Sequence, residues 1–202
     1  MKYPHSIPLW HTNGELLPGG VPTRVVLSSI DTRWNDVVVE QHHFSSIELP
    51  DVMFKQHVIV INTRQSIAGE CKREGRFQPC SKASGAISFF PSDQPFFQRL
   101  KVQRREFART LILALDPVFV RRIAEGLELN ADRIELIEQR RGTDPTLRHI
   151  ALALRAGVQS GAAVDRMYGE ALSTALAVHL LREYGAAVPG PRGSMAGCPA
   201  ES

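Results

Sequence analysis

The first half of the chain alternates short apolar segments with turn-forming residues, and this pattern predicts strands. The segments are rich in Val, Ile and Phe, and their length and regular spacing suit a sandwich or barrel. From about residue 24 to residue 115 they read RVVLSSI, VVVEQHHF, FKQHVIVINT, ISFFP, FFQRLKVQ and EFARTLILALD. Within this region GECKREGRFQPC predicts a hairpin with Gly75 at its tip, because glycine adopts the positive φ of a tight connection.

In the second half the apolar positions recur at a helical period of about 3.6 residues. Asp116 and Asp144 are each followed by proline, which is the pattern of an N-cap and a first helical turn. We therefore expect two helices to begin there, and a third helix from about 165 to 184. The segment NADRIELIEQRRG, between the first two helices, is expected to hold one more strand.

The last two helices are apolar over more than one stripe, so both need cover on two sides. One side can pack on the strands, and the other most economically meets a second copy of the chain in a two-fold dimer. A helical pair buried wholly within one monomer is the alternative. The residues expected at the dimer interface are Leu147, Ile150, Leu154, Tyr168, Leu172, Ala175, Leu176 and His179.

Composition and charge exclude few classes of function. The 24 Lys and Arg against 21 Asp and Glu give a net charge of +3, too small to imply a nucleic-acid surface. A basic cluster is expected to be a solvated strand edge, with a nucleic-acid patch as the alternative: Arg99, Lys101, Arg104, Arg105 and Arg109. No apolar run approaches a membrane span and no signal peptide is visible, so we expect a soluble, cytoplasmic protein without a membrane partner.

The three cysteines, Cys71, Cys80 and Cys198, are too few for a disulfide framework and match no zinc-site spacing. A reduced, intracellular setting is the simpler expectation. Cys71 and Cys80 would face each other, or nearly so, across the predicted hairpin. A disulfide between them is geometrically possible, but we expect two small strand residues instead.

The segments, taken in order, resemble the N-terminal sensing and dimerisation domain of AraC-family transcription regulators. The resemblance spans about 24–185 and rests on RWNDVVVEQHHF, ELPDVMFKQHVIVIN, FPSDQPF, LILALDPVFVRRIAEGL, DPTLRHIALALRAG and YGEALSTALAVHLLREYG. It implies an α+β fold with a cupin-like jelly-roll β-barrel over 1–115 and a helical dimerisation region, a hairpin of helices, over 116–185. Residues 186–202, mostly Ala, Gly, Pro and Ser, are expected to be a disordered tail.

Members of this family normally continue into a tandem helix-turn-helix domain, and residues 186–202 cannot form a recognition helix. We therefore expect no direct DNA binding from this chain. A natural sensor-only protein, a frameshift product and an expressed fragment all fit this pattern. The expected partners are a small-molecule effector of unknown identity, a second copy of the chain, and full-length regulators in heterodimers.

The resemblance implies that the effector binds inside the barrel, and aromatic and histidine side chains expected to point inward are the candidates for contacting it. Plain core packing is the alternative for each aromatic residue. The expected ligand-binding residues are Trp34, His42, Phe44, Phe54, His57 and Phe89.

Metal-dependent cupins use a His-x-His pair, a Glu and a later His, and of this set only His57 stands in the corresponding region. Glu40 and His42 share a strand face and could form a makeshift trio with His57. We expect no metal, no cofactor and no catalysis, and no GxSxG, P-loop or HExxH motif is present. The alternatives are a divergent metal-dependent cupin enzyme, such as an isomerase or dioxygenase, and an adaptor dimer whose barrel is filled by its own side chains.

Overall fold

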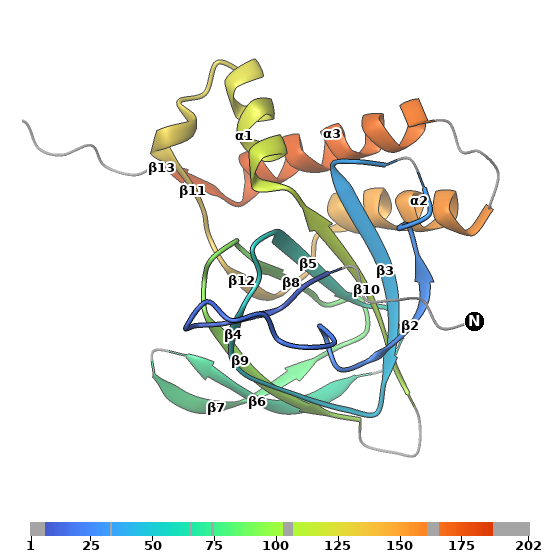
Figure 1. Cartoon of the computed structure of the whole chain (residues 1–202), viewed down its shortest axis with the longest axis vertical. Helices are drawn as coiled ribbons and strands as arrows, with labels where there is room; N and C mark the ends of the chain where they lie inside the picture. Colours follow the sequence, from blue (N-terminus) through green and yellow to red (C-terminus); the bar gives the residue numbers. More distant parts are fainter. Residues whose placement is uncertain are drawn as a thin grey trace, which may run out of the picture.

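The computed structural model describes residues 7–32, 34–64, 66–73, 75–102, 107–160 and 166–187. Two antiparallel sheets face each other, and helices lie outside one of them (Figure 1). The strands are β1 (Trp10–His11), β2 (Arg24–Ser28), β3 (Val37–Phe44), β4 (Ser46–Met53), β5 (His57–Asn62), β6 (Ile67–Arg73), β7 (Arg76–Lys82), β8 (Ile87–Phe90), β9 (Phe96–Lys101), β10 (Ala108–Leu115), β11 (Ile134–Leu136), β12 (Gln139–Gly142) and β13 (Gly185–Ala187). The helices are α1 (Pro117–Gly126), α2 (Pro145–Ser160) and α3 (Arg166–Glu183), with a 3₁₀ turn, η1 (Ala131–Arg133), after α1.

The larger sheet has the order β12-β8-β5-β10-β3-β2, and the smaller has the order β1-β4-β9-β6-β7. Their antiparallel pairing, followed by helices, confirms the predicted α+β, cupin-like fold. The segment expected to hold one strand holds two, because β11 pairs with β13 and β12 extends the larger sheet beside β8.

The N-caps of the first two helices are confirmed. The Asp116 side chain accepts a hydrogen bond from the backbone N–H of Val118 at 2.8 Å, and that of Asp144 accepts one from Leu147 at 2.9 Å. Asp144 Oδ2 also lies 2.6 Å from His179 Nε2, so this carboxylate ties the start of α2 to the end of α3. Burial alone would raise the pKa of Asp144, but the hydrogen bonds it accepts, chiefly from His179, outweigh burial and lower it.

Strand β4 was not predicted, because Pro50 interrupts its pattern. Proline cannot donate a ladder hydrogen bond, so within a sheet it is tolerated at edges and bulges. The pairing of β4 with β9 shifts register between Leu49 and Val52, and Asp51 adopts a positive φ of 32°. The strand therefore accommodates Pro50 at a bulge.

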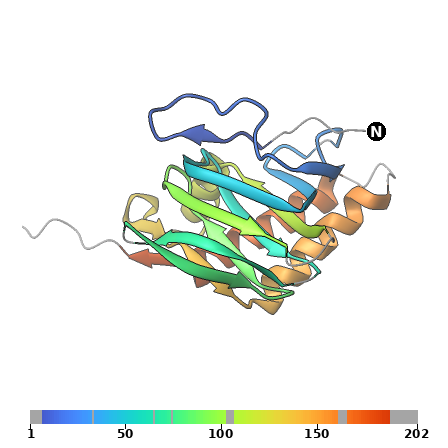
Figure 2. The ribbon, with the colours of Figure 1, turned by 90° about the horizontal axis from the view of Figure 1, so that it is seen from below.

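The three helices cover the outer face of the larger sheet (Figure 2). Along β5, Ile59 and Ile61 point toward the helices, whereas Val58 and Val60 point between the sheets. The helices and this sheet therefore share one core. The predicted tail, 186–202, lies outside the described residues except for the end of β13.

Several residues expected at a dimer interface are instead buried inside the chain itself. Leu147, Leu154 and Leu176 have 0% exposed surface and pack in the core between the helices and the larger sheet. This corrects the prediction for these three residues, because they pack against the apolar outer face of the larger sheet and not against a second copy of the chain. Ile150 and Leu172 are partly buried beside the same core, and His179 is half-buried against Asp144.

Cys71 and Cys80 form a disulfide, which corrects the expectation of two free thiols. In the β6–β7 hairpin Cys71 is the register partner of Gln78 and Cys80 of Gly69, so the two cysteines are diagonal neighbours. Their Cα atoms are 5.9 Å apart, within the range that a disulfide spans. Both side chains are buried between the two sheets.

Candidate effector site

The structure separates the six predicted ligand-binding residues into two groups. Phe44 and Phe54 lie in the core between the sheets, and His42 shares the strand face of Phe44. The other three point away from the interior, which corrects the expectation that they line it: Trp34, His57 and Phe89. The larger sheet is apolar on both faces, so an aromatic residue at one of its positions can face either the interior or the helices.

The interior between the sheets is almost filled by side chains. Phe96 stacks against Phe54 and Phe90 with ring centroids 5.1 and 4.6 Å apart, and Ile7 and Leu9 from the N-terminal segment are buried in the same core. The remaining cavity measures about 30 Å³. That is room for a water molecule or two, far below the volume of an effector.

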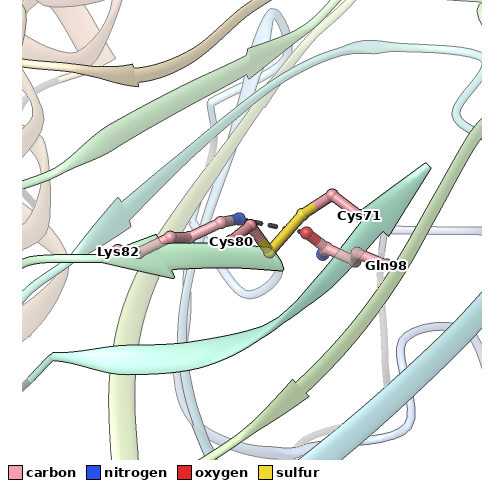
Figure 3. Close-up of a disulfide and its surroundings, with 4 residues drawn as sticks. All are labelled: Cys71, Cys80, Lys82 and Gln98. Carbon is pink, nitrogen blue, oxygen red and sulfur yellow. Dashed lines mark hydrogen bonds between the residues drawn. A yellow bond between two sulfur atoms is a disulfide. The ribbon is translucent and has the colours of Figure 1, made fainter. Parts of the chain in front are cut away.

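Polar groups nevertheless line this cavity beside the disulfide. Lys82 is 4% exposed, and its Nζ donates to Gln98 Oε1 at 3.0 Å. Figure 3 shows both side chains next to the Cys71–Cys80 bridge. The strand register explains the cluster, because Lys82 follows Cys80 by two residues on β7 and Gln98 is the cross-strand partner of Cys71. Lys82 and Gln98 were not predicted as site residues, although the two-residue step from Cys80 to Lys82 was a usable signal.

A second buried polar chain runs along the larger sheet. His42 Nε2 lies 2.9 Å from Glu40 Oε2, and His42 Nδ1 lies 2.5 Å from Thr23 Oγ1. Ser28 Oγ donates to Glu40 Oε1 at 3.3 Å. Glu40 and His42 are both 0% exposed, so this series of hydrogen bonds connects the buried interior to Thr23, which is only part-buried.

His57 cannot join Glu40 and His42, because it lies on the opposite face of the sheet. Its Nδ1 accepts a hydrogen bond from the backbone N–H of Ser92 at 3.1 Å, and its ring contacts Phe89. It borders a cavity of about 150 Å³ beneath α1 and β11. Burial lowers the pKa of His57 to about 4, although the charges of Asp93 and Asp116 act in the opposite direction.

His57 should therefore make the fold sensitive to acid. The pKa of His57 is lower in the folded chain than in the unfolded chain, so between pH 6.5 and 4 the unfolded chain binds more protons. The folded state therefore loses stability as the pH is lowered through this range. We expect His57 to account for a loss of about 2 kcal/mol between pH 7 and pH 5. Urea unfolding of the wild type and of His57→Gln at both pH values measures this. Equal pH dependence in the two proteins would contradict the assignment.

Within the part of the chain that the structure describes, no group of three or more His, Cys, Asp or Glu is placed to hold a metal ion. Among the same residues, no helix is long and apolar enough to span a membrane.

An open groove of about 630 Å³ lies at one end of the sandwich. Thr23 and Phe44 line both this groove and the interior cavity, so the two are adjacent. Phe107 stands at the groove with 62% of its surface exposed. The other residues that line the groove are polar or small: Pro22, Arg24, His43, Ser45 and Ser46.

Positive charge gathers beside the groove. Arg24 and Arg109 are the cross-strand partners of His43 on either side, so the three side chains lie in a row on one face of the sheet. Burial first, then the charges of Arg109, Arg24 and Arg64 with a contribution from His42, lower the pKa of His43. Arg109 was predicted only as part of a basic strand edge, and Arg24 and His43 were not predicted as site residues.

The predicted basic cluster does not form one surface. Arg99 is paired with Glu48 at 2.6 Å and with Glu70 at 3.5 Å on the smaller sheet, whereas Arg109 belongs to the row beside the groove. Lys101 is exposed at the end of β9, and Arg104 and Arg105 lie outside the described residues.

Comparisons with solved structures place the fold among cupin-like proteins. The apo structure of a variant of ToxT from Vibrio cholerae, an AraC-family regulator, has a TM-score of 0.52 at 10% identity, covering 76% of this chain and 58% of that one. Oxalate decarboxylase from Bacillus subtilis has a TM-score of 0.35 at 13% identity, covering 55% of this chain and 33% of that one.

Vicilin from Corylus avellana has a TM-score of 0.36 at 11% identity, covering 46% of this chain and 29% of that one. This chain thus spans less than two thirds of each of these structures. No protein-family model and no curated protein matches the sequence. The chain therefore has a cupin-like domain with C-terminal helices, and its likeness to ToxT is a likeness of fold.

Proposed function

We propose that this chain is the effector-sensing and dimerisation domain of an AraC-type transcription regulator, acting in the cytoplasm and without catalysis. The observation that carries the proposal is the likeness of fold to ToxT, which covers 76% of this chain at a TM-score of 0.52. The other two folds named above align over at most 55% of it, at TM-scores below 0.4. The order of sequence segments supports the same assignment independently.

Dimerisation would use the surface that α3 leaves uncovered. Ala175 is exposed on this helix, and Tyr168, about two turns before it, is 43% exposed. Leu172, between them, is only partly buried. These three positions remain from the predicted interface, and they fall on one side of the helix at three- and four-residue spacing. A second copy of the chain, or a full-length regulator in a heterodimer, would cover this surface.

Light scattering and sedimentation of the purified chain test this assignment. We expect a dimer, and we expect Ala175→Glu to shift it to a monomer, because a carboxylate would be buried without a partner at the two-fold contact. Val118→Glu is the matched control, since Val118 is 72% exposed but lies on α1. A wild-type monomer at high concentration, or a dimer that Ala175→Glu leaves intact, would refute the proposed interface.

A further inference from the structure

The row formed by Arg24, His43 and Arg109 has no carboxylate to neutralise it among the described residues. Ion pairs do form elsewhere on this surface, but none of them includes Arg24, Arg64 or Arg109. Arg24 and Arg109 flank His43 from the two neighbouring strands, so two guanidinium groups lie on the same face of the sheet with only the histidine between them. The fold therefore maintains a local positive potential that a bound anion would relieve.

The adjoining groove has the size and walls of a small-ligand site. Its volume of about 630 Å³ falls within the range of small-molecule pockets. Phe107 and Pro22 offer apolar surface, Arg24 offers a planar fork that pairs with a carboxylate through two parallel hydrogen bonds, and Ser45 and Ser46 add hydroxyl groups. The interior cavity, at about 30 Å³, could not hold the same molecule without rearrangement.

We propose that this groove, rather than the interior of the sandwich, binds the effector, and that the effector is a small organic carboxylate with a flat apolar body. This inference rests on the proposed sensing function. The carboxylate lies between Arg24 and Arg109, and the apolar body lies against Phe107. Thr23 lines the groove and contacts His42, which in turn contacts Glu40. A ligand that touches Thr23 would therefore be linked through these contacts to the buried Glu40–His42 pair.

Calorimetric titration of the full chain with benzoate and 2-naphthoate, each against its own amide, tests the charge requirement. Each carboxylate and its amide have nearly the same shape, so a difference reports the charge. We expect each carboxylate to bind at least tenfold more tightly than its amide. Equal affinity, no binding of either carboxylate, or equal binding of inorganic phosphate would overturn the proposal.

Variants locate the site. We expect Arg24→Gln and Arg109→Gln each to weaken carboxylate binding three- to tenfold, while Arg99→Gln, which alters an arginine of the smaller sheet, leaves it unchanged. Thermal unfolding of each variant checks that it is folded. Loss of binding in Lys82→Met but not in Arg24→Gln would place the carboxylate inside the sandwich and refute the groove. Displacement of the carboxylate by a short DNA duplex would instead identify a nucleic-acid surface. A negative result in these titrations does not affect the dimer measurement, so the groove site and the proposed dimerisation can be refuted independently.

Discussion

Replacing Gly169 by alanine should destabilise the fold by about 3 kcal/mol, although alanine is the better helix former by about 1 kcal/mol. The indole of Trp34 lies directly over Gly169 of α3, and a methyl group there would overlap its five-membered ring. Trp34 is 8% exposed and packed in the core beneath the helices, so the ring has little space into which it can move. Either the indole or α3 must shift, and both changes open the core.

Gly157 on α2 provides the matched control. A Cβ there would lie 3.1 Å from the far edge of the same indole, a contact that a small adjustment relieves. We expect Gly157→Ala to change stability by less than about 1 kcal/mol, because gained helix propensity offsets the crowding. Urea denaturation of the two variants measures the difference.

A double-mutant cycle identifies the cause. In a Trp34→Leu background the Gly169→Ala substitution should cost much less than in the wild type, because the ring it meets has gone. Equal costs in the two backgrounds would show that Trp34 is not the obstacle. A Gly169→Ala protein as stable as the wild type would contradict the packing itself.

Reducing the Cys71–Cys80 disulfide should lower the free energy of unfolding by about 3 kcal/mol. The bond closes a loop between residues nine positions apart, and a constraint of this length removes roughly that much chain entropy from the unfolded state. Both sulfur atoms are buried between the sheets, so two thiols must also be accommodated without a bond between them.

The measurement compares urea unfolding of the oxidised protein, the reduced protein and the Cys71→Ala/Cys80→Ala variant. We expect the reduced protein and the variant to unfold at lower urea than the oxidised protein, and the variant to be insensitive to reductant. An oxidised protein that loses nothing on reduction would show that the bond does not stabilise the fold.

The elements of this fold were largely readable along the chain. Local chemistry fixes a helix start: Asp116 and Asp144 cap their helices through hydrogen bonds two or three residues away, and the structure confirms both. The alternation of strand residues likewise predicted that Glu40 and His42 share a face, and the structure confirms this, with His42 Nε2 2.9 Å from Glu40 Oε2. Strand β4 was not predicted, because a proline such as Pro50 is unfavourable inside a strand. Only the pairing of β4 with β9 forms the bulge that accommodates Pro50.

The sequence by itself determined most of the strands, the three helices, and that the folded chain is a sandwich followed by helices. It did not determine which face of each strand is the interior. On β5 both faces are apolar, since helices cover one and the smaller sheet covers the other, so the polar and apolar contrast that orients a strand is absent. Only tertiary packing placed Trp34 over Gly169 and His57 beneath α1, and only strand register aligned Arg24, His43 and Arg109, because those contacts join residues far apart along the chain.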